Sequence, residues 1–566
     1  MYINDLRKEF YEQLLGKRVL VLVAQDIDAL CTCKVLQYLF QCDHIQYSVV
    51  PVRTKNDLTS AYSQQTDQIH HVILINCGAT YDVLELFEPP NEEVVFFIVD
   101  NHRPVDVINI YSEKQVKLLM KPDSSENVPS FDQLFRVDES EEDSDEEESD
   151  RRKRFDVEYL EKKRERRIWT EERQKLIFDY TQFTYYSTSS ACILLELAWK
   201  MSKDTNDLLW WAIVGLTDQY ISQKIEQNSY LMSLGTLQGF VTRHNHKSND
   251  ENDVTVDTMK ISFEKVYPYE TAKFFLRLNL YRHWSIYDSL TNTMYTACKF
   301  KLWTLKGKKR LSEFLADLGL PLQQCKQRFA SVDMNLKSRF QGWIEEKAER
   351  YSLSDIIYGS FVAKYGFRHM FSAADISYAV KSILESYGAD MTETDRFHVA
   401  LDCLSRSHIS IVYKGLELAK KQQIAIFQLV QALLDMNHVI SAGPFLYAAI
   451  PEGTPDSKLF CHPESLEMVA RFVLTAHVST TKNKKSKSLP LVMTTPQNDR
   501  SESLLLVVGI PPLSEDSQKN LFGKAFLQAG TKSKCTFIQD FFDSSVVEIR
   551  KDDKGKFLDT LSLLLT

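Results

Sequence analysis

The sequence predicts an α/β protein in three parts: a first domain with a parallel sheet (1–224), a helical inserted middle domain (225–395) and a smaller C-terminal α/β domain (396–566). Strand-like runs that are apolar throughout alternate with helix-like segments over the first 110 residues, which is typical of a parallel sheet covered on both faces. Long amphipathic helices follow, and mixed patterns return after about residue 396. A chain of 566 residues is also too long for one core.

The first domain has four expected strands, separated by helices of which the first ends near Phe40; the strands are 18–25, 45–52, 70–78 and 93–101. Two later segments, 188–201 and 206–221, are apolar on nearly every side, which predicts buried helices of the same domain. The expected cap of the first of them is Ser187, Thr188 or Ser189. Ligands of parallel sheets bind at the carboxyl ends of the strands, so polar residues at those ends are the candidates for a site.

An acidic run interrupts the first domain. Residues 138–150, "DESEEDSDEEESD", carry ten acids and no base, and without them the net charge of −9 becomes +1. The charge balance therefore neither demands nor forbids a nucleic-acid partner. We expect a disordered loop over about 136–168. Ser140 and Ser144 have acids at the third position after them and are candidate phosphorylation sites; a merely solubilising loop is the alternative.

Two basic clusters separated by seven residues follow the acids, as in a bipartite nuclear import signal. The candidate residues are Arg151, Arg152, Lys153, Arg154, Lys162, Lys163 and Arg164. The alternative is a solvated helix whose bases balance the nearby acids. The import interpretation predicts a nuclear protein.

The C-terminal part is a mixture of strand and helix patterns. "HISIVYKG" (407–414) is strand-like, 415–436 is a long helix, 503–510 and 544–552 are further strands, and 555–565 closes the chain as a helix. No run approaches the ~20 apolar residues of a membrane span, so no membrane partner is expected. Ten scattered cysteines without paired spacing indicate reduced thiols in a cytosolic or nuclear protein.

Polar residues stand at the ends of three expected strands and in one helix. "QDID" places Asp26 and Asp28 after the first strand, and "INCG" places Asn76 after the third; "VDNHRP" follows the fourth strand with Asp100, Asn101 and His102, and the helical "AIVGLTDQ" carries Asp218. Paired acids after a strand are a common start to a two-metal phosphoesterase site. An Asp there also commonly caps the following helix.

These four motifs, in this order, resemble those of the DHH phosphoesterase superfamily, which includes the RecJ single-strand exonucleases and the family II pyrophosphatases. The resemblance implies a RecJ-like DHH domain and a DHHA1-like C-terminal domain. It also implies that one metal would be held at positions 22, 26 and 76, and the other at 28, 76, 101 and 218. Here Leu22, Asn76 and Asn101 replace the His, Asp and His of the active motif.

The substitutions predict that the site is vestigial. A two-metal phosphoesterase needs both ions close together, and the ligand shared by the two ions has become a neutral amide. We therefore expect no hydrolysis, no bound metal and no cofactor, with Asp26 and Asp28 kept as helix caps and Asp100 hydrogen-bonded to His102. The alternative is an active, metal-dependent single-strand DNA phosphoesterase or exonuclease of the RecJ type that has recruited replacement ligands such as His44 or Cys77.

The retained and substituted residues, with the acidic loop and the basic segment after it, resemble an inactive eukaryotic branch of the superfamily that acts in DNA replication. The resemblance spans essentially the full chain; only the glycine-rich signature of the C-terminal domain is faint, in "LFGKAFLQAG" (521–530). It implies a non-catalytic subunit of the replicative helicase that bridges the minichromosome maintenance ring and the GINS complex. Replicative polymerases, checkpoint or loading factors and single-stranded DNA are the further partners that it implies.

Overall fold

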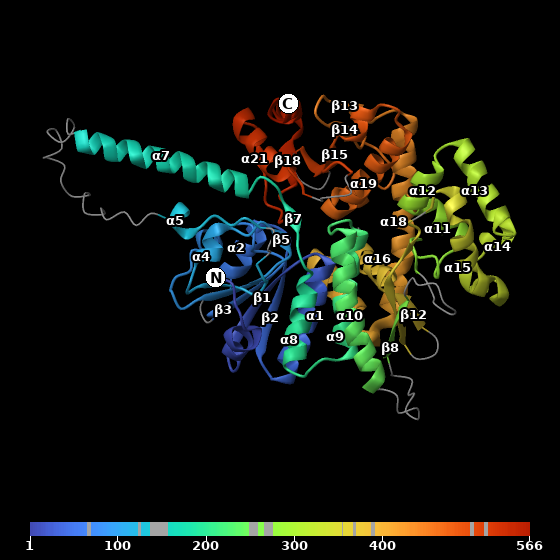
Figure 1. Ribbon diagram of the computed structural model, residues 1–566, viewed down its shortest axis with the longest axis horizontal. Coiled ribbons are helices and arrows are strands. Elements are labelled where there is room, and N and C mark those ends of the chain that lie inside the picture. The colour runs from blue at the N-terminus through green and yellow to red at the C-terminus, as the bar shows by residue number, and fades with distance from the viewer. Residues whose placement is uncertain are drawn as a thin grey trace.

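A five-stranded parallel sheet forms the centre of the first domain (Figure 1). Its strands are β1 (Arg18–Ala24), β2 (Gln46–Val52), β3 (His71–Ile75), β4 (Val95–Val99) and β6 (Val116–Leu118), in the order β2-β1-β3-β4-β6. All of its neighbouring strands pair in parallel, which confirms the predicted sheet. The strand order reverses between β1 and β3, and in such sheets this reversal opens a crevice at the carboxyl ends.

The computed structural model describes most of the chain. The described residues are 1–64, 69–122, 126–135, 157–247, 259–264, 275–353, 355–365, 369–386, 391–497, 503–513 and 519–566. None of the helices among these residues is long and apolar enough to cross a membrane. All ten cysteines are free thiols.

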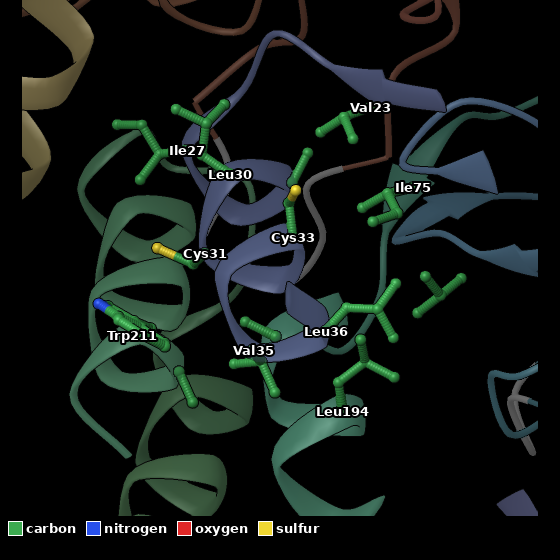
Figure 2. Packing of buried hydrophobic residues seen from close by; sticks show 14 of the residues in the cluster. Val23, Ile27, Leu30, Cys31, Cys33, Val35, Leu36, Ile75, Leu194 and Trp211 are labelled. Atoms are coloured by element: carbon green, nitrogen blue, oxygen red, sulfur yellow. The ribbon is translucent and has the colours of Figure 1, made fainter. Parts of the chain in front are cut away.

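Helix α1 (Ile27–Cys42) lies between the sheet and the two helices that the sequence predicts to be buried, α8 (Ser190–Lys200) and α9 (Asn206–Ile221). Figure 2 shows this packing: Val23 and Ile75 of the sheet face one side of α1, and Leu194 and Trp211 face the other. The Trp211 indole N–H donates to the carbonyl of Leu404 at 2.9 Å. Because α1 is covered from both sides, nearly all of its side chains are buried, and its first turn is fixed at the crevice.

Short elements complete the first domain. They are η1 (Leu6–Phe10), η2 (Tyr11–Leu14), α2 (Lys55–Ser63), α3 (Val83–Phe87), β5 (His102–Arg103), α4 (Val107–Tyr111), α5 (Phe131–Leu134) and β7 (Tyr185–Tyr186). Strand β7 pairs with β5 and thereby carries the chain from the end of β4 towards α8.

The predicted disordered loop is wrong from Val157 onward, because helix α7 (Val157–Tyr180) begins there and extends away from the sheet (Figure 1). Its sequence is rich in Glu, Lys and Arg, which favour helix even without a buried face. Lys162, Lys163 and Arg164 lie on this helix, as the solvated-helix alternative predicts. Residues 136–156, with Ser140, Ser144 and the cluster Arg151 to Arg154, lie outside the described residues.

The middle part is mostly helical, as predicted, but contains short strands that the sequence did not indicate. Its elements are α10 (Gln227–Lys247), β8 (Met259–Glu264), β9 (Phe275–Leu276), α11 (Ile286–Asn292), α12 (Met294–Phe300), α13 (Leu305–Asp317), α14 (Leu322–Cys325), η4 (Phe329–Ser331), α15 (Met334–Ala348), η5 (Glu349–Tyr351), β10 (Ile357–Tyr358), β11 (Ser360–Tyr365), β12 (His369–Ser372), α16 (Ala373–Leu384) and α17 (Glu393–Cys403). Strands β8, β11 and β12 form an antiparallel sheet. One hydrophobic cluster runs from Leu6 to Ala419, and a second joins helices α11–α15 to the C-terminal part, so the three-part division stays a prediction.

The C-terminal part is a mixed six-stranded sheet in the order β13-β14-β15-β16-β18-β17, covered by helices. Its elements are η6 (Arg406–His408), α18 (Ile409–Asp435), β13 (Ile440–Ser441), β14 (Leu446–Ala449), η7 (Ser457–Cys461), α19 (Pro463–Thr480), α20 (Lys484–Lys487), β15 (Leu491–Gln497), β16 (Leu504–Ile510), α21 (Phe522–Ser533), β17 (Phe537–Ile538), β18 (Val546–Arg550), η8 (Lys551–Asp553) and α22 (Lys554–Leu565). The predicted strands at 503–510 and 544–552 and the closing helix are confirmed.

The strand predicted at 407–414 is wrong, because α18 already begins at Ile409. The β-branched residues of this segment favour a strand by composition. Val412, Leu416 and Ala419 nevertheless recur at helical spacing, and all three are buried. Gly415 allows close approach to α16, since a Cβ atom there would lie 2.8 Å from the carbonyl oxygen of Ala379.

Leu36 tests the packing of α1. It is 1 % exposed between the sheet and α8, and we expect Leu36→Ala to lower the free energy of unfolding by about 2–5 kcal/mol because it leaves a cavity. Urea denaturation followed by circular dichroism measures the change. The matched control is Leu231→Ala on α10, where the side chain is 49 % exposed and the expected change is within about 0.5 kcal/mol. Equal effects of the two substitutions would contradict the described packing.

Candidate functional site

The carboxyl ends of β1 and β3 bring Asp26, Asp28 and Asn76 together. Asp26 is the N-cap of α1, and its Oδ1 accepts a hydrogen bond from the backbone N–H of Ala29 at 2.9 Å. The Asn76 Nδ2 lies 3.0 and 3.3 Å from the two carboxylate oxygens of Asp26 and 3.4 Å from Asp28 Oδ2. The Asn76 Oδ1 accepts from Ser190 Oγ at 2.6 Å. A single amide therefore joins the two carboxylates, and the helix-capping role predicted for Asp26 is confirmed.

Asp28 is buried at the N-terminus of α8. Its carboxylate accepts hydrogen bonds from the backbone N–H groups of Ser190 and Ala191 at 2.8 and 3.2 Å, from the Ser189 hydroxyl, and from Asn101 Nδ2 at 2.8 Å. The first N–H groups of a helix lack partners within the helix and favour a negative charge. Asp28 therefore caps α8 rather than the helix that follows it in sequence. Ser189 occupies the predicted N-cap position, but its hydroxyl donates to Asp28.

Helix α9 brings Asp218 to the same region. Gly215 of α9 lies so close to Asp28 that a Cβ atom there would be 2.6 Å from Asp28 Oδ1. Asp218 Oδ1 accepts a hydrogen bond from Ser377 Oγ at 2.8 Å and lies 3.5 Å from the ammonium group of Lys381. Both partners come from α16, so the fourth acid is held by the middle part of the chain.

Asp100 and His102 form a hydrogen-bonded pair at the end of β4, as predicted. Asp100 accepts from the backbone N–H groups of Gly78 and Ala79 at 3.1 and 3.0 Å, and its Oδ1 lies 2.7 Å from His102 Nδ1. Burial raises the pKa of Asp100, but His102 and the N–H groups outweigh burial and leave the pKa below its ordinary value. Burial lowers the pKa of His102, and the Asp100 carboxylate reverses this and raises it. The pair is therefore a local ion pair that fixes the loop after β4.

The substituted positions are filled by packed side chains. Leu22 is fully buried in β1. The Cys77 Sγ lies 3.4 Å from the carbonyl oxygen of Leu22, and burial raises the pKa of this thiol well above its ordinary value. His44 is exposed just beyond the C-terminal end of α1, about 24 Å along the helix from Asp26. Neither His44 nor Cys77 is placed as a replacement ligand, so that part of the enzyme alternative is wrong.

A pair of divalent cations does not fit these residues. A ligand must direct a lone pair at the ion, but the Asn76 amide directs its N–H groups at the carboxylates. The Asp28 oxygens are occupied by N–H and O–H donors, and Lys381 stands beside Asp218. Within the described ranges, no group of three or more His, Cys, Asp or Glu side chains is arranged to hold a metal ion.

A cavity of about 120 Å³ remains between the first domain and the C-terminal part. Its lining includes the carboxylates of Asp26, Glu385, Glu464, Glu467 and Asp543 and the cationic groups of Arg53 and Lys224. Burial raises the pKa of Asp26 to about 7, although the nearby Lys224 ammonium lowers it. Burial likewise raises the pKa of both Glu385 and Glu467 to about 7. A lining in which acids outnumber bases does not favour a phosphate backbone.

Sequence reasoning missed the residues that hold the old ligands in place: Ser189 and Ser190 as donors, and Lys224, Lys381 and Glu464 as charges. The serines gave a signal, because they directly precede an apolar helix. The lysines gave none, since Lys381 and Asp218 meet only through the packing of α16 on α9. Glu464 comes from α19, farther still along the chain.

A parallel sheet of this order, with Asp26, Asp28, Asn76, Asp100 and Asp218 converging on its carboxyl edge, defines a RecJ-like member of the DHH phosphoesterase superfamily in which the metal positions have been rebuilt. The family model CDC45 matches residues 19–133 and 120–564. The chain therefore belongs to the CDC45 family. This membership makes it a protein of DNA replication and the cell cycle.

Individual relatives agree with this assignment. The chain is 47 % identical over 577 residues to the cell division control protein 45 homolog of Homo sapiens, with 100 % of both chains covered. It is 29 % identical to the homolog of Schizosaccharomyces pombe, with 97 % of this chain and 96 % of the relative covered. The crystal structure of CDC45 from Entamoeba histolytica has the same fold, with a TM-score of 0.70, 24 % identity and full coverage of both chains.

Asn76→Asp tests the joining of the two carboxylates. The substitution replaces the donor by a third carboxylate, and we expect the free energy of unfolding to fall by about 3–5 kcal/mol at neutral pH. The folded-state pKa of the new group is raised above its unfolded value, so the deficit is largest above the folded pKa and shrinks as the pH falls through it. Denaturation of both proteins at about pH 8 and about pH 5 measures this difference.

The matched control is Asn437→Asp. Asn437 has the same left-handed backbone, with a φ of 52° against 53° at Asn76, but it is exposed. We expect it to change stability by less than about 0.5 kcal/mol at both pH values. An Asn76→Asp protein as stable as this control would show that the amide donor is dispensable.

Proposed function

We propose that this chain is a non-catalytic subunit of the replicative DNA helicase that bridges the minichromosome maintenance ring and the GINS complex in the nucleus. Membership of the CDC45 family supports the replication role. The observation that carries the non-catalytic role is the Asn76 amide between Asp26 and Asp28. An enzyme of this superfamily needs two cations at this position to clamp the attacking and leaving oxygens, and here the space between the carboxylates holds N–H groups.

A subunit without chemistry must act through its surfaces. Helices α11–α15 form a group at one end of the molecule (Figure 1), and the start of α13 carries Leu305, which is 88 % exposed. Exposed apolar side chains on a rigid helical scaffold are suited to anchor a partner. We assign this group as one docking surface for the ring or GINS, with polymerases and checkpoint or loading factors as further partners.

Single-stranded DNA is a further partner in this proposal, and the acidic lining of the cavity places its contact elsewhere. The segment around α20 carries Lys482, Lys484, Lys485 and Lys487, which are all exposed. Such a run is suited to phosphate contacts. The exposed basic run of α13, from Lys306 to Arg310, provides a comparison of similar charge.

Assembly is tested with purified ring, GINS and this chain. We expect a ternary complex in size-exclusion chromatography, and we expect Leu305→Asp to weaken it by about tenfold, which corresponds to about 1.4 kcal/mol. Leu563→Asp is the matched control, because Leu563 is 81 % exposed on α22. Failure of the wild-type chain to join either partner would contradict the proposal. So would manganese-dependent cleavage of labelled single strands that disappears in the Asp28→Ala, Asp218→Ala variant.

DNA binding is tested with a labelled oligonucleotide in fluorescence anisotropy over about 50–200 mM salt. We expect substitution of the four α20-segment lysines by Gln to weaken binding and to reduce the salt slope by about 0.7 for each phosphate that the variant no longer neutralises. The control replaces Lys306, Lys308, Lys309 and Arg310 by Gln, and its slope should equal that of the wild type. Weaker binding by the control variant alone would contradict the assignment to α20.

A further inference from the structure

Two buried lysines stand among the remaining acids. The Lys381 side chain is 6 % exposed; its Nζ lies 3.5 Å from Asp218 Oδ1 and 3.4 Å from Glu464 Oε2, and it donates to Ser222 Oγ at 2.9 Å. The Lys224 side chain is 13 % exposed, and its Nζ lies 3.7 Å from Glu464 Oε1. The two ammonium groups therefore share one carboxylate, Glu464, which approaches from the opposite side of the cleft.

These lysines remain charged although they are buried. Burial lowers the pKa of Lys224, but the carboxylates around it, led by Glu464 and Glu467, outweigh burial and raise the pKa to about 12. The pKa of Lys381 is also raised, with Asp218 as the strongest opposing charge. A buried ammonium group is stable only when such partners surround it. The site thus holds two permanent positive charges beside Asp26 and Asp218.

We propose that the ammonium groups of Lys224 and Lys381 take over the charge-neutralising role of the two divalent cations, so that the chain carries its own counter-ions and excludes metal. This inference deepens the non-catalytic function proposed above and rests on it. It adds that the missing ligands are only half of the reason for metal exclusion. The other half is repulsion by cations that the chain cannot release.

The same lysines hold the cleft closed. Asp218 and Ser222 belong to α9 and the residue after it, Lys381 to α16, and Glu464 to α19, so one group of charges joins the first domain, the middle part and the C-terminal part. The Tyr186 hydroxyl donates to Asp543 Oδ2 at 2.7 Å across the same cleft, and Lys224 Nζ lies 4.9 Å from the centroid of the Tyr186 ring. An exchangeable metal would leave such a joint dependent on its supply, whereas a lysine does not.

The test restores the ligands with and without the lysines. The first variant carries Leu22→His, Asn76→Asp and Asn101→His; the second adds Lys224→Met and Lys381→Met. The control variant instead adds Lys34→Met and Lys203→Met, which remove two partly buried lysines outside the site. Mn²⁺ alone is the probe, and the free ion is measured by electron paramagnetic resonance.

We expect the first variant and the control to bind Mn²⁺ no more tightly than the wild type. The second variant should bind two ions more tightly by about 100-fold or more. Tight binding by the first variant would overturn the inference, and so would a folded second variant that binds no manganese. Assembly and DNA cleavage are measured on the wild-type chain, so failure of the proposed function is recognised independently.

A second measurement covers the case in which the restored variants fail to fold. Lys381→Met in the otherwise native chain leaves Asp218 and Glu464 without their ammonium partner, beside a cavity of about 70 Å³ that Asp218, Lys381 and Glu464 line. We expect its thermal midpoint to fall and to recover in part when Mn²⁺ is added, while Lys34→Met shows no response to the ion. A Lys381→Met midpoint that ignores manganese would overturn the inference.

Discussion

The contact on which the site depends is the Asn76 amide placed between the carboxylates of Asp26 and Asp28. Two buried carboxylates side by side repel each other, and water is absent to screen them. In an enzyme of this superfamily, cations remove that repulsion; in this chain N–H groups remove it. The exchange keeps the backbone intact, because Asn and Asp both tolerate the left-handed conformation at residue 76. The fold of the active relatives can therefore survive without their metals.

From this contact the order extends outward through shared partners. Asp28 caps α8, and Ser190 at the start of α8 holds the Asn76 oxygen, so β3, α1 and α8 are fixed to one another. Gly215 admits α9 close to Asp28. Asp218 then connects α9 to α16 through Ser377 and Lys381. The former catalytic residues are now the fasteners of a scaffold, which is why four acids remain where no chemistry is proposed.

The sequence was sufficient to predict the parallel sheet, the buried helices and the meeting of Asp26, Asn76 and Asp100, because carboxyl ends of parallel strands share one edge. It was insufficient where tertiary packing overrides local pattern. The segment from Ile409 looks like a strand by composition, yet its buried residues follow helical spacing. The acidic run concealed the start of α7, whose own residues favour helix. Lys224 and Lys381 carried no local signal, because what gives them a role is a set of carboxylates from distant segments.

The second hydrophobic cluster determines where mechanical load travels in this molecule. Phe314 of α13 and Phe340 of α15 belong to the same cluster as Val430 of α18 and Val469 of α19. A force applied to the helical end by a moving partner is therefore carried into the C-terminal sheet, and it reaches the first domain only through α18 and the charged joint at Glu464. The molecule is stiff along that line, so a displacement at one end becomes a rotation of the C-terminal part as a whole.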